Sequence, residues 1–593
     1  MDKFVSRKDL KTQRFFIEIA RNFFLCCFVA LRETFALCVI VFCAAAPLRA
    51  DAETVLRRTV DRVSSLDPIM SETVGASRCV MLPYESLLEY DYAARPYKLI
   101  GGLAEAPPKI SPDGKIYTFK IRAGKIFGPD ACFGLDPATG APKQRELVAD
   151  DIVYSFKRLA DAKLSSPGYW LVEDKIAGIG EFHEASLDTA TNTDYSLPVR
   201  GLRAPDARTL VIELDAPSPD FIWGLAMSFT AAVPREAVEF YGKNFDSVAV
   251  GTGLYNVAKF RRNYGLEFVR KTGGASHGGG EIDRIIYPVI DDASTRWLSF
   301  LSGQLDVIGE ITRDNWDAVI KDGELAPELR RRGVTLNAKP SLDTYYVGFN
   351  LSDPVLGRNK KLRQAMTCAF DSAEWARLNL GRVVPATGPV PPGIDGRLET
   401  APPYFFDLER AQKLLAEAGY ENGVDPATGR RLSLTLELGR TDQEIRENAE
   451  LIASFMGRIG ISIKLQYNNW PSFLRKIGRR EAQMFLIGWM ADYPSALNFL
   501  QLFVGKNSSP GPNRANYENP RYDRLFEQAE REMDDAKRME LIHEMQEILR
   551  EDCPWIFLYH RRDNMLVSPA LRNVILHDYP YGMEKHWRKD AAR

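Results

Sequence analysis

Histidine is the residue type through which catalytic or metal chemistry is first sought, and this sequence has only six of them. His183-Glu184 would begin a zinc-protease pair, but Leu187 stands where the second histidine would be needed. His543 and Glu547 are one helical turn apart, yet two ligands alone bind a metal weakly, and the surrounding charges indicate a solvated face. We therefore expect no metal site and no cofactor.

A second candidate for chemistry is Gly274-Ala275-Ser276-His277-Gly278, which matches the nucleophile elbow of hydrolases. An elbow needs an apolar strand leading into it and a helix packed behind it. Here Lys271-Thr272-Gly273 precedes the motif and Gly279-Gly280 follows it, which favours a flexible glycine-rich turn. An exported hydrolase with Ser276 as its nucleophile stays open as the alternative to a protein without catalytic activity.

The elements around these residues alternate between strands and helices, which indicates an α/β protein. Alternating leucines predict a strand over residues 432–438, and apolar residues at helical spacing predict a helix over 444–459 that ends at Gly460. A second strand follows over 461–467. This is a βαβ unit, so its strands should be parallel and its crossover right-handed.

Further elements follow from the same signals. Ser111-Pro112-Asp113-Gly114 predicts a turn before a strand over 115–122. Asp150 and Asp151 predict the start of a helix over 152–160, because carboxylates suit the positive end of a helix. The other expected elements are a surface loop over 127–146, helices over 522–532 and 536–551, and a buried strand over 555–559.

Length and composition describe a folded chain with a large core. The 593 residues are 45% hydrophobic and 26% charged, which excludes disordered and collagen-like proteins. Since domains usually have ~100 to 200 residues, we expect two or three lobes around a ligand-binding cleft. The formal charge is only −2, which argues against nucleic acid as a partner.

The beginning of the chain has the order of a secretory signal. Basic residues come first, an uninterrupted apolar run follows over 35–47, and Leu48-Arg49-Ala50 precedes the acidic Asp51. The apolar run is shorter than the ~20 residues of a membrane-spanning helix. We therefore expect residues 1–50 to be a cleaved signal peptide and the exported body to be soluble.

The cysteines beyond this leader are few and far apart. They are Cys79, Cys132, Cys368 and Cys553, and their spacing matches no metal-binding motif. In an oxidising compartment, a Cys79–Cys132 disulfide and four unpaired buried thiols are both open alternatives.

An ordered series of short motifs runs along most of the chain. The first half contains Leu66-Asp67-Pro68, Tyr84-Glu85-Ser86-Leu87-Leu88, Val250-Gly251-Thr252-Gly253 and Ser302-Gly303-Gln304-Leu305-Asp306. The second half contains Leu362-Arg363-Gln364-Ala365, Pro389-Val390-Pro391-Pro392-Gly393 and Gly488-Trp489-Met490-Ala491-Asp492-Tyr493-Pro494. In this order they resemble the solute-binding proteins of bacterial ABC importers, in the family of dipeptide- and oligopeptide-binding proteins. Their order indicates the family and says little about the ligand.

The resemblance implies a two-lobed α/β fold of the periplasmic binding protein type, class II, with an extra N-terminal subdomain and a hinge. Lobe I would comprise residues 51–341, including the subdomain at about 90–200, and would be completed by 562–593. Lobe II would comprise 342–561, with crossings near 342–348 and 559–562. Such a protein is a monomeric periplasmic receptor that binds a peptide or peptide-like solute and delivers it to permease subunits in the membrane.

The resemblance also implies ligand-binding residues. Asp492, just past the apolar run 484–488, matches an aspartate that pairs with the ligand's free α-amino group. Trp489 matches a tryptophan of the side-chain pocket, and Tyr493 adjoins them. The position after a strand suits a ligand site in an open α/β sheet. The structural alternatives are a loop-capping carboxylate for Asp492 and a core residue for Trp489.

Tyr345 and Tyr346 match a strand that pairs with the peptide backbone in the family. Neighbouring residues of a strand point to opposite faces, so at most one of the two should face the ligand.

Two departures from the family pattern leave the solute class open. Phe127-Gly128-Pro129-Asp130 stands where a Phe-x-Asp-Gly turn is common, and Ser495 stands where an acidic residue is frequent. Other members of the family carry sugars, opines or nickel complexes, and the few histidines disfavour nickel. A sugar- or opine-binding protein is therefore the alternative to a peptide receptor.

Overall fold

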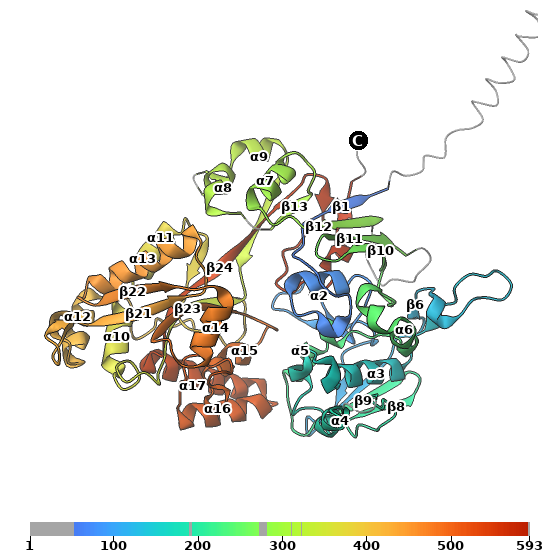
Figure 1. The fold of residues 1–593 in the computed structure, drawn as a ribbon, viewed down its shortest axis with the longest axis horizontal. Coiled ribbons are helices and arrows are strands. Elements are labelled where there is room, and N and C mark those ends of the chain that lie inside the picture. Colours follow the sequence, from blue (N-terminus) through green and yellow to red (C-terminus); the bar gives the residue numbers. More distant parts are fainter. Residues whose placement is uncertain (1–52, 189–191, 272–280, 310, 322, 591–593) are drawn as a thin grey trace, which may run out of the picture. The chain divides into compact units, whose positions relative to one another are not determined.

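A computed structural model describes residues 53–188, 192–271, 281–309, 311–321 and 323–590 of the chain. Its largest sheet contains the predicted βαβ unit (Figure 1). Strands β21 (Ser433–Leu438) and β22 (Ser462–Tyr467) are parallel, and helix α13 (Gln443–Gly457) joins them. The apolar stripe of α13 is buried, so the predicted elements and the predicted parallel pairing are confirmed.

Three further strands continue this sheet. Strand β23 (Met484–Met490) is parallel to β21, and β17 (Asp343–Phe349) pairs antiparallel with β23. Strand β24 (Trp555–Val567) pairs with β17 through its first half. Its second half pairs with β16 (Thr335–Pro340) and β13 (Val307–Ile308). The predicted strand over 555–559 therefore begins correctly and ends later, because β16 and β13 supply hydrogen-bonding partners beyond Tyr559.

Helices cover both faces of the large sheet, which explains the unbroken apolar run at the start of β23. One face packs against α10 (Lys360–Ala369), α12 (Leu408–Glu417) and α13 through residues that include Val347, Leu436 and Leu486. The opposite face packs through residues that include Tyr346, Phe485 and Trp555. The helices on that face are α14 (Trp470–Gly478), α15 (Leu497–Leu500), α16 (Pro520–Arg531) and α17 (Asp535–Asp552).

The N-terminal part of the chain forms two smaller sheets (Figure 1). The first contains β1 (Val55–Arg57), β10 (Tyr255–Arg261), β11 (Gly265–Arg270) and β12 (Arg284–Pro288). The second contains β4 (Lys109–Ile110), β5 (Ile116–Lys120), β8 (Leu202–Asp206) and β9 (Thr209–Glu213), and α3 (Ala149–Ala160) packs on it. Asp150 and Asp151 lie in the first turn of α3, as predicted.

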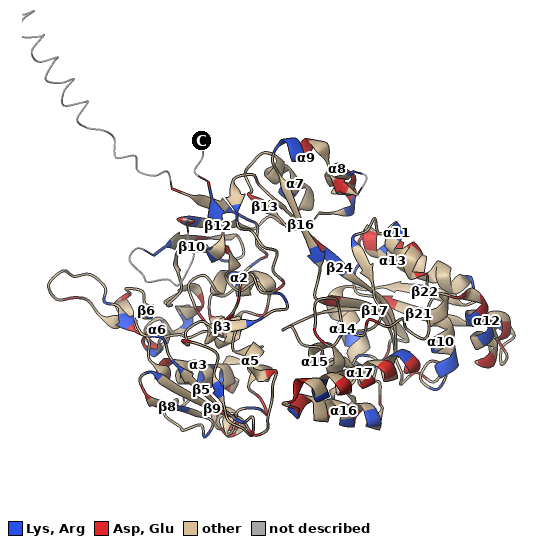
Figure 2. Cartoon of the chain, turned by 180° about the vertical axis from the view of Figure 1, so that it is seen from behind, with Lys and Arg blue, Asp and Glu red and all other residues tan. Residues whose placement is uncertain are grey.

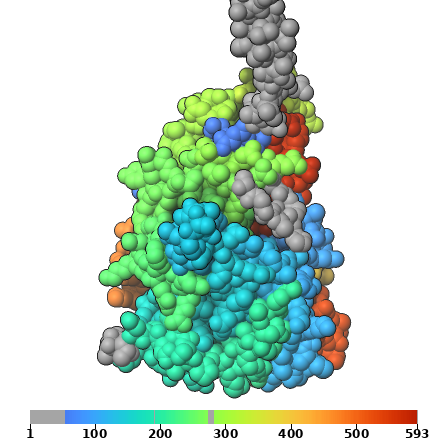
Figure 3. Space-filling model, turned by 90° about the vertical axis from the view of Figure 1, so that its right-hand side faces the viewer, coloured from blue at the N-terminus to red at the C-terminus, as the bar shows by residue number. Residues whose placement is uncertain are grey.

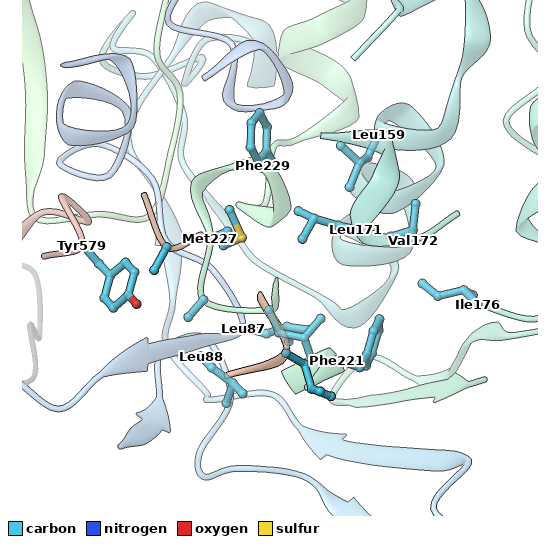
Figure 4. Packing of buried hydrophobic residues seen from close by; sticks show 14 of the residues in the cluster. Leu87, Leu88, Leu159, Leu171, Val172, Ile176, Phe221, Met227, Phe229 and Tyr579 are labelled. Atoms are coloured by element: carbon cyan, nitrogen blue, oxygen red, sulfur yellow. The ribbon is translucent and has the colours of Figure 1, made fainter. Parts of the chain in front are cut away.

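A continuous hydrophobic core lies beside the second small sheet (Figure 4). Leu159 of α3, Leu171 and Phe221 lie in it, and Tyr579 reaches it from the C-terminal segment. The same cluster includes Leu500 of α15, so the core extends to the helices on one face of the large sheet.

The predicted surface loop over 127–146 is a hairpin. Strands β6 (Ile126–Phe127) and β7 (Arg145–Glu146) pair antiparallel at its base, and its atoms stand out from the surface in Figure 3. At the tip, the Oδ1 atom of Asp136 accepts hydrogen bonds from the backbone N–H groups of Ala138 and Thr139, each with an N···O distance of 2.9 Å. The alternation of strand residues is too short here to be recognised from sequence, which is why a loop was expected.

The remaining predictions concern the cysteines and the leader. All four cysteines are free thiols, so the structure has no Cys79–Cys132 disulfide. Cys79, Cys368 and Cys553 are buried, as in the second alternative, whereas Cys132 is partly exposed. The predicted signal peptide, residues 1–50, lies outside the described residues. Among the described residues, no helix combines the length and the apolar character needed to cross a membrane.

Candidate functional site

Three parallel strands of the large sheet end along one edge, which brings together residues that are far apart in sequence. Strands β21, β22 and β23 run in the same direction, so their carboxyl ends share this edge. Arg440 follows β21, Trp470 follows β22 and Asp492 follows β23. We call these three residues and the loops that carry them the carboxyl edge.

The loop that carries Asp492 is held at both ends. Before it, β23 pairs with β17 up to Met490, and the N–H of Ala491 donates to the carbonyl of Leu342 at 2.8 Å. After it, the chain enters α15, in which Asn498 is fully buried at 0% exposure. The loop that carries Asp492 is therefore short and is anchored by β23 on one side and by α15 on the other.

Asn498 connects the predicted residues of this loop. Its Oδ1 atom accepts the indole N–H of Trp489 at 3.0 Å and the backbone N–H of Asp492 at 3.1 Å. Its Nδ2 group donates to the Oδ2 atom of Asp492 at 3.0 Å. Trp489 is therefore both packed against the core and part of the polar network around Asp492.

The carboxylate of Asp492 has no cationic partner among the residues that the structure describes. Burial raises its pKa above the ordinary aspartate value, and the hydrogen bond from Asn498 acts in the opposite direction. Tyr493 and Tyr581 are the titratable groups whose charge interacts with it. Burial raises the pKa of both phenols, so they stay neutral at physiological pH. A carboxylate in such surroundings favours a cationic ligand group.

Tyr493 lies against an aromatic ring from the N-terminal part of the chain. Its ring and that of Trp170 are nearly parallel, with centroids 6.5 Å apart and an interplanar angle of 25°. Tyr493 therefore connects the Asp492 loop to the N-terminal part of the chain.

The two tyrosines of β17 point to opposite faces of the sheet, as predicted. Tyr346 is 2% exposed and stacks on Trp555 in the core. Tyr345 stacks on Tyr559, with centroids 4.9 Å apart, and lines a cavity of about 420 Å³. Of the two, the structure brings only Tyr345 to a space that a ligand can enter.

The cavity beside Tyr345 reaches Arg440 and Trp470 of the carboxyl edge, whereas Trp489, Asp492 and Tyr493 are not among its lining residues. Gly488, Trp470 and Arg440 line it together with Tyr345 and Tyr559. Gly488 lies opposite Tyr345 in the β17–β23 pairing, and a Cβ atom there would come within 2.7 Å of the Tyr345 ring. The glycine therefore makes room for that ring.

Charged residues gather on the walls of this cavity, and Figure 2 shows Lys and Arg in the middle of β24. Two of its arginines are paired within the protein, Arg561 with Asp343 at 2.6 Å and Arg382 with Glu444. Arg440 pairs with Asp442 at 2.8 Å, and its side chain is 68% exposed. Arg562 is exposed and forms no ion pair with a described residue. The cavity therefore offers guanidinium groups to an anionic ligand group.

Four residues of this region were not among the predicted site residues: Arg440, Trp470, Arg562 and Asn498. For Arg440 and Trp470 a signal existed, because each directly follows a predicted parallel strand, as Asp492 does. For Asn498 there was none, since an asparagine in a short apolar helix gives no sign of which loop it contacts.

The catalytic candidates are not assembled into a site in the part of the chain that is described. No group of three or more metal-ligating side chains occurs among these residues. The ring of His183 stacks on Tyr169, and its Nδ1 atom lies 2.8 Å from the carbonyl oxygen of Ala160. These contacts indicate a packing role for His183. Ser276 and its motif lie outside the described residues.

Comparison with known proteins gives a consistent result. The model of the family described as bacterial extracellular solute-binding proteins, family 5 middle, matches residues 98–511. The periplasmic oligopeptide-binding protein OppA of Escherichia coli is 27% identical over 532 residues, covering 88% of this chain and 89% of that protein. Heme-binding protein A of Haemophilus influenzae is 24% identical over 482 residues, covering 80% and 81%.

The fold is also similar to solved structures. The periplasmic binding protein DppA of Helicobacter pylori, solved in complex with the peptide STSA, superposes with a TM-score of 0.69 at 22% identity. The similarity covers 91% of this chain and 98% of that protein. The predicted α/β periplasmic binding protein fold is thereby confirmed.

Proposed function

Because the chain belongs to the bacterial extracellular solute-binding proteins of family 5, we propose that it is a periplasmic receptor of an ABC importer that captures a peptide or peptide-like solute. Residues 1–50 direct its export, and the loaded receptor delivers its solute to permease subunits in the membrane. Relatives named for periplasmic peptide binding, such as OppA of Escherichia coli, support this assignment.

The observation that carries the proposal is the unpaired carboxylate of Asp492. A carboxylate without a cation, in surroundings that raise its pKa, is unfavourable in the empty protein. The α-amino group of a peptide supplies the missing positive charge through a charge-assisted hydrogen bond. A neutral sugar would leave the carboxylate unpaired, which favours a peptide over that alternative.

The other end of the solute faces the arginines of the cavity. A ligand whose amino end contacts Asp492 would direct its carboxylate toward Arg440 and Arg562, whose guanidinium groups belong to residues that line the cavity.

Closure of two lobes around the ligand is part of the proposal. Lobe I (51–341, completed by 562–593) and lobe II (342–561) would be joined where β16 leads into β17 and where β24 passes from one set of partners to the other. Ligand contacts to both lobes would favour the closed state over the open one.

The solute leaves the protein chemically unchanged. The family consists of solute-binding proteins. Incubation with peptides should therefore leave their masses unaltered. Cleavage that disappears in Ser276→Ala would instead support a hydrolase.

Affinity selection tests the peptide assignment directly. A random pool of tetrapeptides is incubated with the wild-type protein and with Asp492→Asn, and bound peptides are identified by mass spectrometry. We expect the wild type to retain peptides and the variant to retain at least ten times fewer. Equal retention by both proteins would remove Asp492 from the binding site.

A further inference from the structure

Asn498 is fully buried, and its side chain holds the loop that carries Asp492. Its side chain contacts Trp489 and both the backbone and the carboxylate of Asp492. One buried amide thus contacts two of the three residues of the loop that were predicted to bind the ligand.

The orientation of this amide is fixed by its neighbours. A carboxamide offers one acceptor oxygen with two lone pairs and one NH₂ group with two donors. Both contacts to Oδ1 come from N–H groups, which can only donate. The NH₂ group must therefore point to the Oδ2 atom of Asp492, and the reversed amide would place donor against donor.

In this arrangement, the two carboxylate oxygens of Asp492 have different hydrogen-bonding partners. Oδ2 accepts the hydrogen bond from Asn498, whereas Oδ1 accepts none from a described residue. The partner of Oδ2 is a neutral amide, so it does not offset the negative charge of the carboxylate. An arginine or lysine in the same place would have neutralised it.

From this geometry we infer that Asn498 is a positioning residue that sets the selectivity for a charged amino end, by fixing the Asp492 carboxylate with one oxygen free and its charge unpaired. The inference rests on the proposed function, since it presumes a ligand with an ammonium group. It predicts that the loss of the Asn498 amide weakens discrimination between free and acetylated amino ends, even though Asp492 is still present.

Asn513 provides a matched control in the same part of the chain. It is equally buried, at 0% exposure, and its amide also makes three hydrogen bonds. Their partners are Val504 and Tyr517, away from the Asp492 loop. Asn513→Ala should therefore lower stability about as much as Asn498→Ala does without a comparable effect on selectivity.

A second variant separates positioning from folding. Asn498→Asp keeps an oxygen that accepts the N–H groups of Trp489 and Asp492, but it can no longer donate to Oδ2 when ionised. Two adjacent carboxyl groups then share a proton: the pair keeps one negative charge over a wide pH range, and the pH at which it loses its second proton rises. Tyr493 from the loop and Tyr581 from the C-terminal segment are the other titratable groups that interact with Asp492.

The experiment uses a random tetrapeptide pool and the same pool acetylated at its amino ends. Retention of both pools is measured between pH 4 and pH 8 for the wild type, Asp492→Asn, Asn498→Ala, Asn498→Asp and Asn513→Ala. We expect selectivity for free amino ends to fall about tenfold in Asn498→Ala, which corresponds to the loss of one hydrogen bond to a charged group. In Asn498→Asp, the pH profile of binding should differ from that of the wild type, because the carboxyl pair loses its second proton at a raised pH. Asn513→Ala should stay within about twofold of the wild type.

The outcomes distinguish this inference from the proposed function. If both Asn498 variants keep the selectivity and pH profile of the wild type while Asp492→Asn loses its selectivity, Asn498 has no positioning role and the function stands. If Asp492→Asn keeps its selectivity, or if the wild type retains neither pool, the proposed function fails and the inference fails with it.

Discussion

Asp492 occupies a position in which its charge is costly in the empty protein and useful in the loaded one. Its surroundings consist of the Asn498 amide, neutral tyrosines and the end of a strand, none of which carries a positive charge. The free energy that the empty protein loses by holding this carboxylate is recovered when a cation arrives. Substitution of Asp492 should therefore change the stability of the empty protein and its affinity for the ligand in opposite directions.

Asp492→Asn should make the ligand-free protein more stable. Burial raises the pKa of the carboxyl, so between the ordinary and the raised value the folded protein holds more protons than the unfolded one. Stability therefore falls as pH rises through that window, and the cost persists at neutral pH. We expect the variant to gain about 1 kcal/mol at pH 7 and to lose this advantage below the ordinary aspartate pKa.

Thermal unfolding of ligand-free protein at several pH values measures this effect. Asp136→Asn in the hairpin is the control with the opposite sign, because backbone N–H groups lower the pKa of Asp136. That variant should gain no stability at pH 7. An Asp492→Asn protein that melts below the wild type at pH 7 would contradict the account.

Arg440 should recognise the carboxyl end of the ligand. Arg440→Gln removes a guanidinium group at the cavity wall, and a charge-assisted hydrogen bond of about 1.5 to 3 kcal/mol corresponds to at least a tenfold loss of affinity. The loss should be confined to peptides with free carboxylates and absent for peptides amidated at that end. Arg430→Gln, at an exposed position of β20 (Arg430–Arg431), is the control. Calorimetry with both peptide types would show an equal loss for each if Arg440 had no such role.

At the scale of elements, the sequence predicted what depends on local periodicity. The βαβ unit of β21, α13 and β22 followed from regular spacing of apolar residues, and the structure confirms it. The length of β24 did not follow, because charged residues 561–563 look like the end of a strand until β16 is known to pair with them. Local composition does not reveal which distant segments will pair. The ends of strands and the residues that line a cavity therefore cannot be predicted from it.

Ser495 illustrates the same limit within the candidate site. At this position, an acidic residue is common in the family, but here the Ser495 hydroxyl donates to Asp220, the residue before α5 (Phe221–Gly224). Asp220 also pairs with Arg538 of α17, and both side chains are largely buried, at 13% and 11% exposure. The loop after Asp492 is thus connected to the N-terminal part of the chain through Asp220, and no motif around Asp220 marks it for this contact.

Removal of one partner from this pair should destabilise the protein strongly. Arg538→Ala leaves the Asp220 carboxylate partly buried without its cation, which costs about 3 kcal/mol. Arg521→Ala breaks an exposed pair between α16 and α17, Arg521 with Glu544, and should cost less than about 1 kcal/mol. Urea unfolding of the two variants makes the comparison. Equal midpoints would show that the Asp220–Arg538 pair contributes no more than a surface pair.

At the scale of the whole molecule, composition and the order of motifs predicted a large α/β binding protein, and the similarity to solved structures confirms that fold. The lobe boundaries stay a prediction. They were placed at strands near residues 342 and 562, where no linker-like composition marks a division. A strand that passes between two sheets has the same alternation as any other strand, so its role in a hinge is not visible in its residues.

The central claim, that this protein holds a peptide by its charged ends and releases it intact, is tested most directly by identifying its natural cargo. Wild-type protein and Asp492→Asn are purified without denaturation, then denatured, and the released solutes are analysed by mass spectrometry. The account predicts peptides with free amino and carboxyl ends in the wild type, and a strongly reduced yield in the variant. Release of a sugar, an opine or another solute without an amino end, in equal amounts from both proteins, would contradict it.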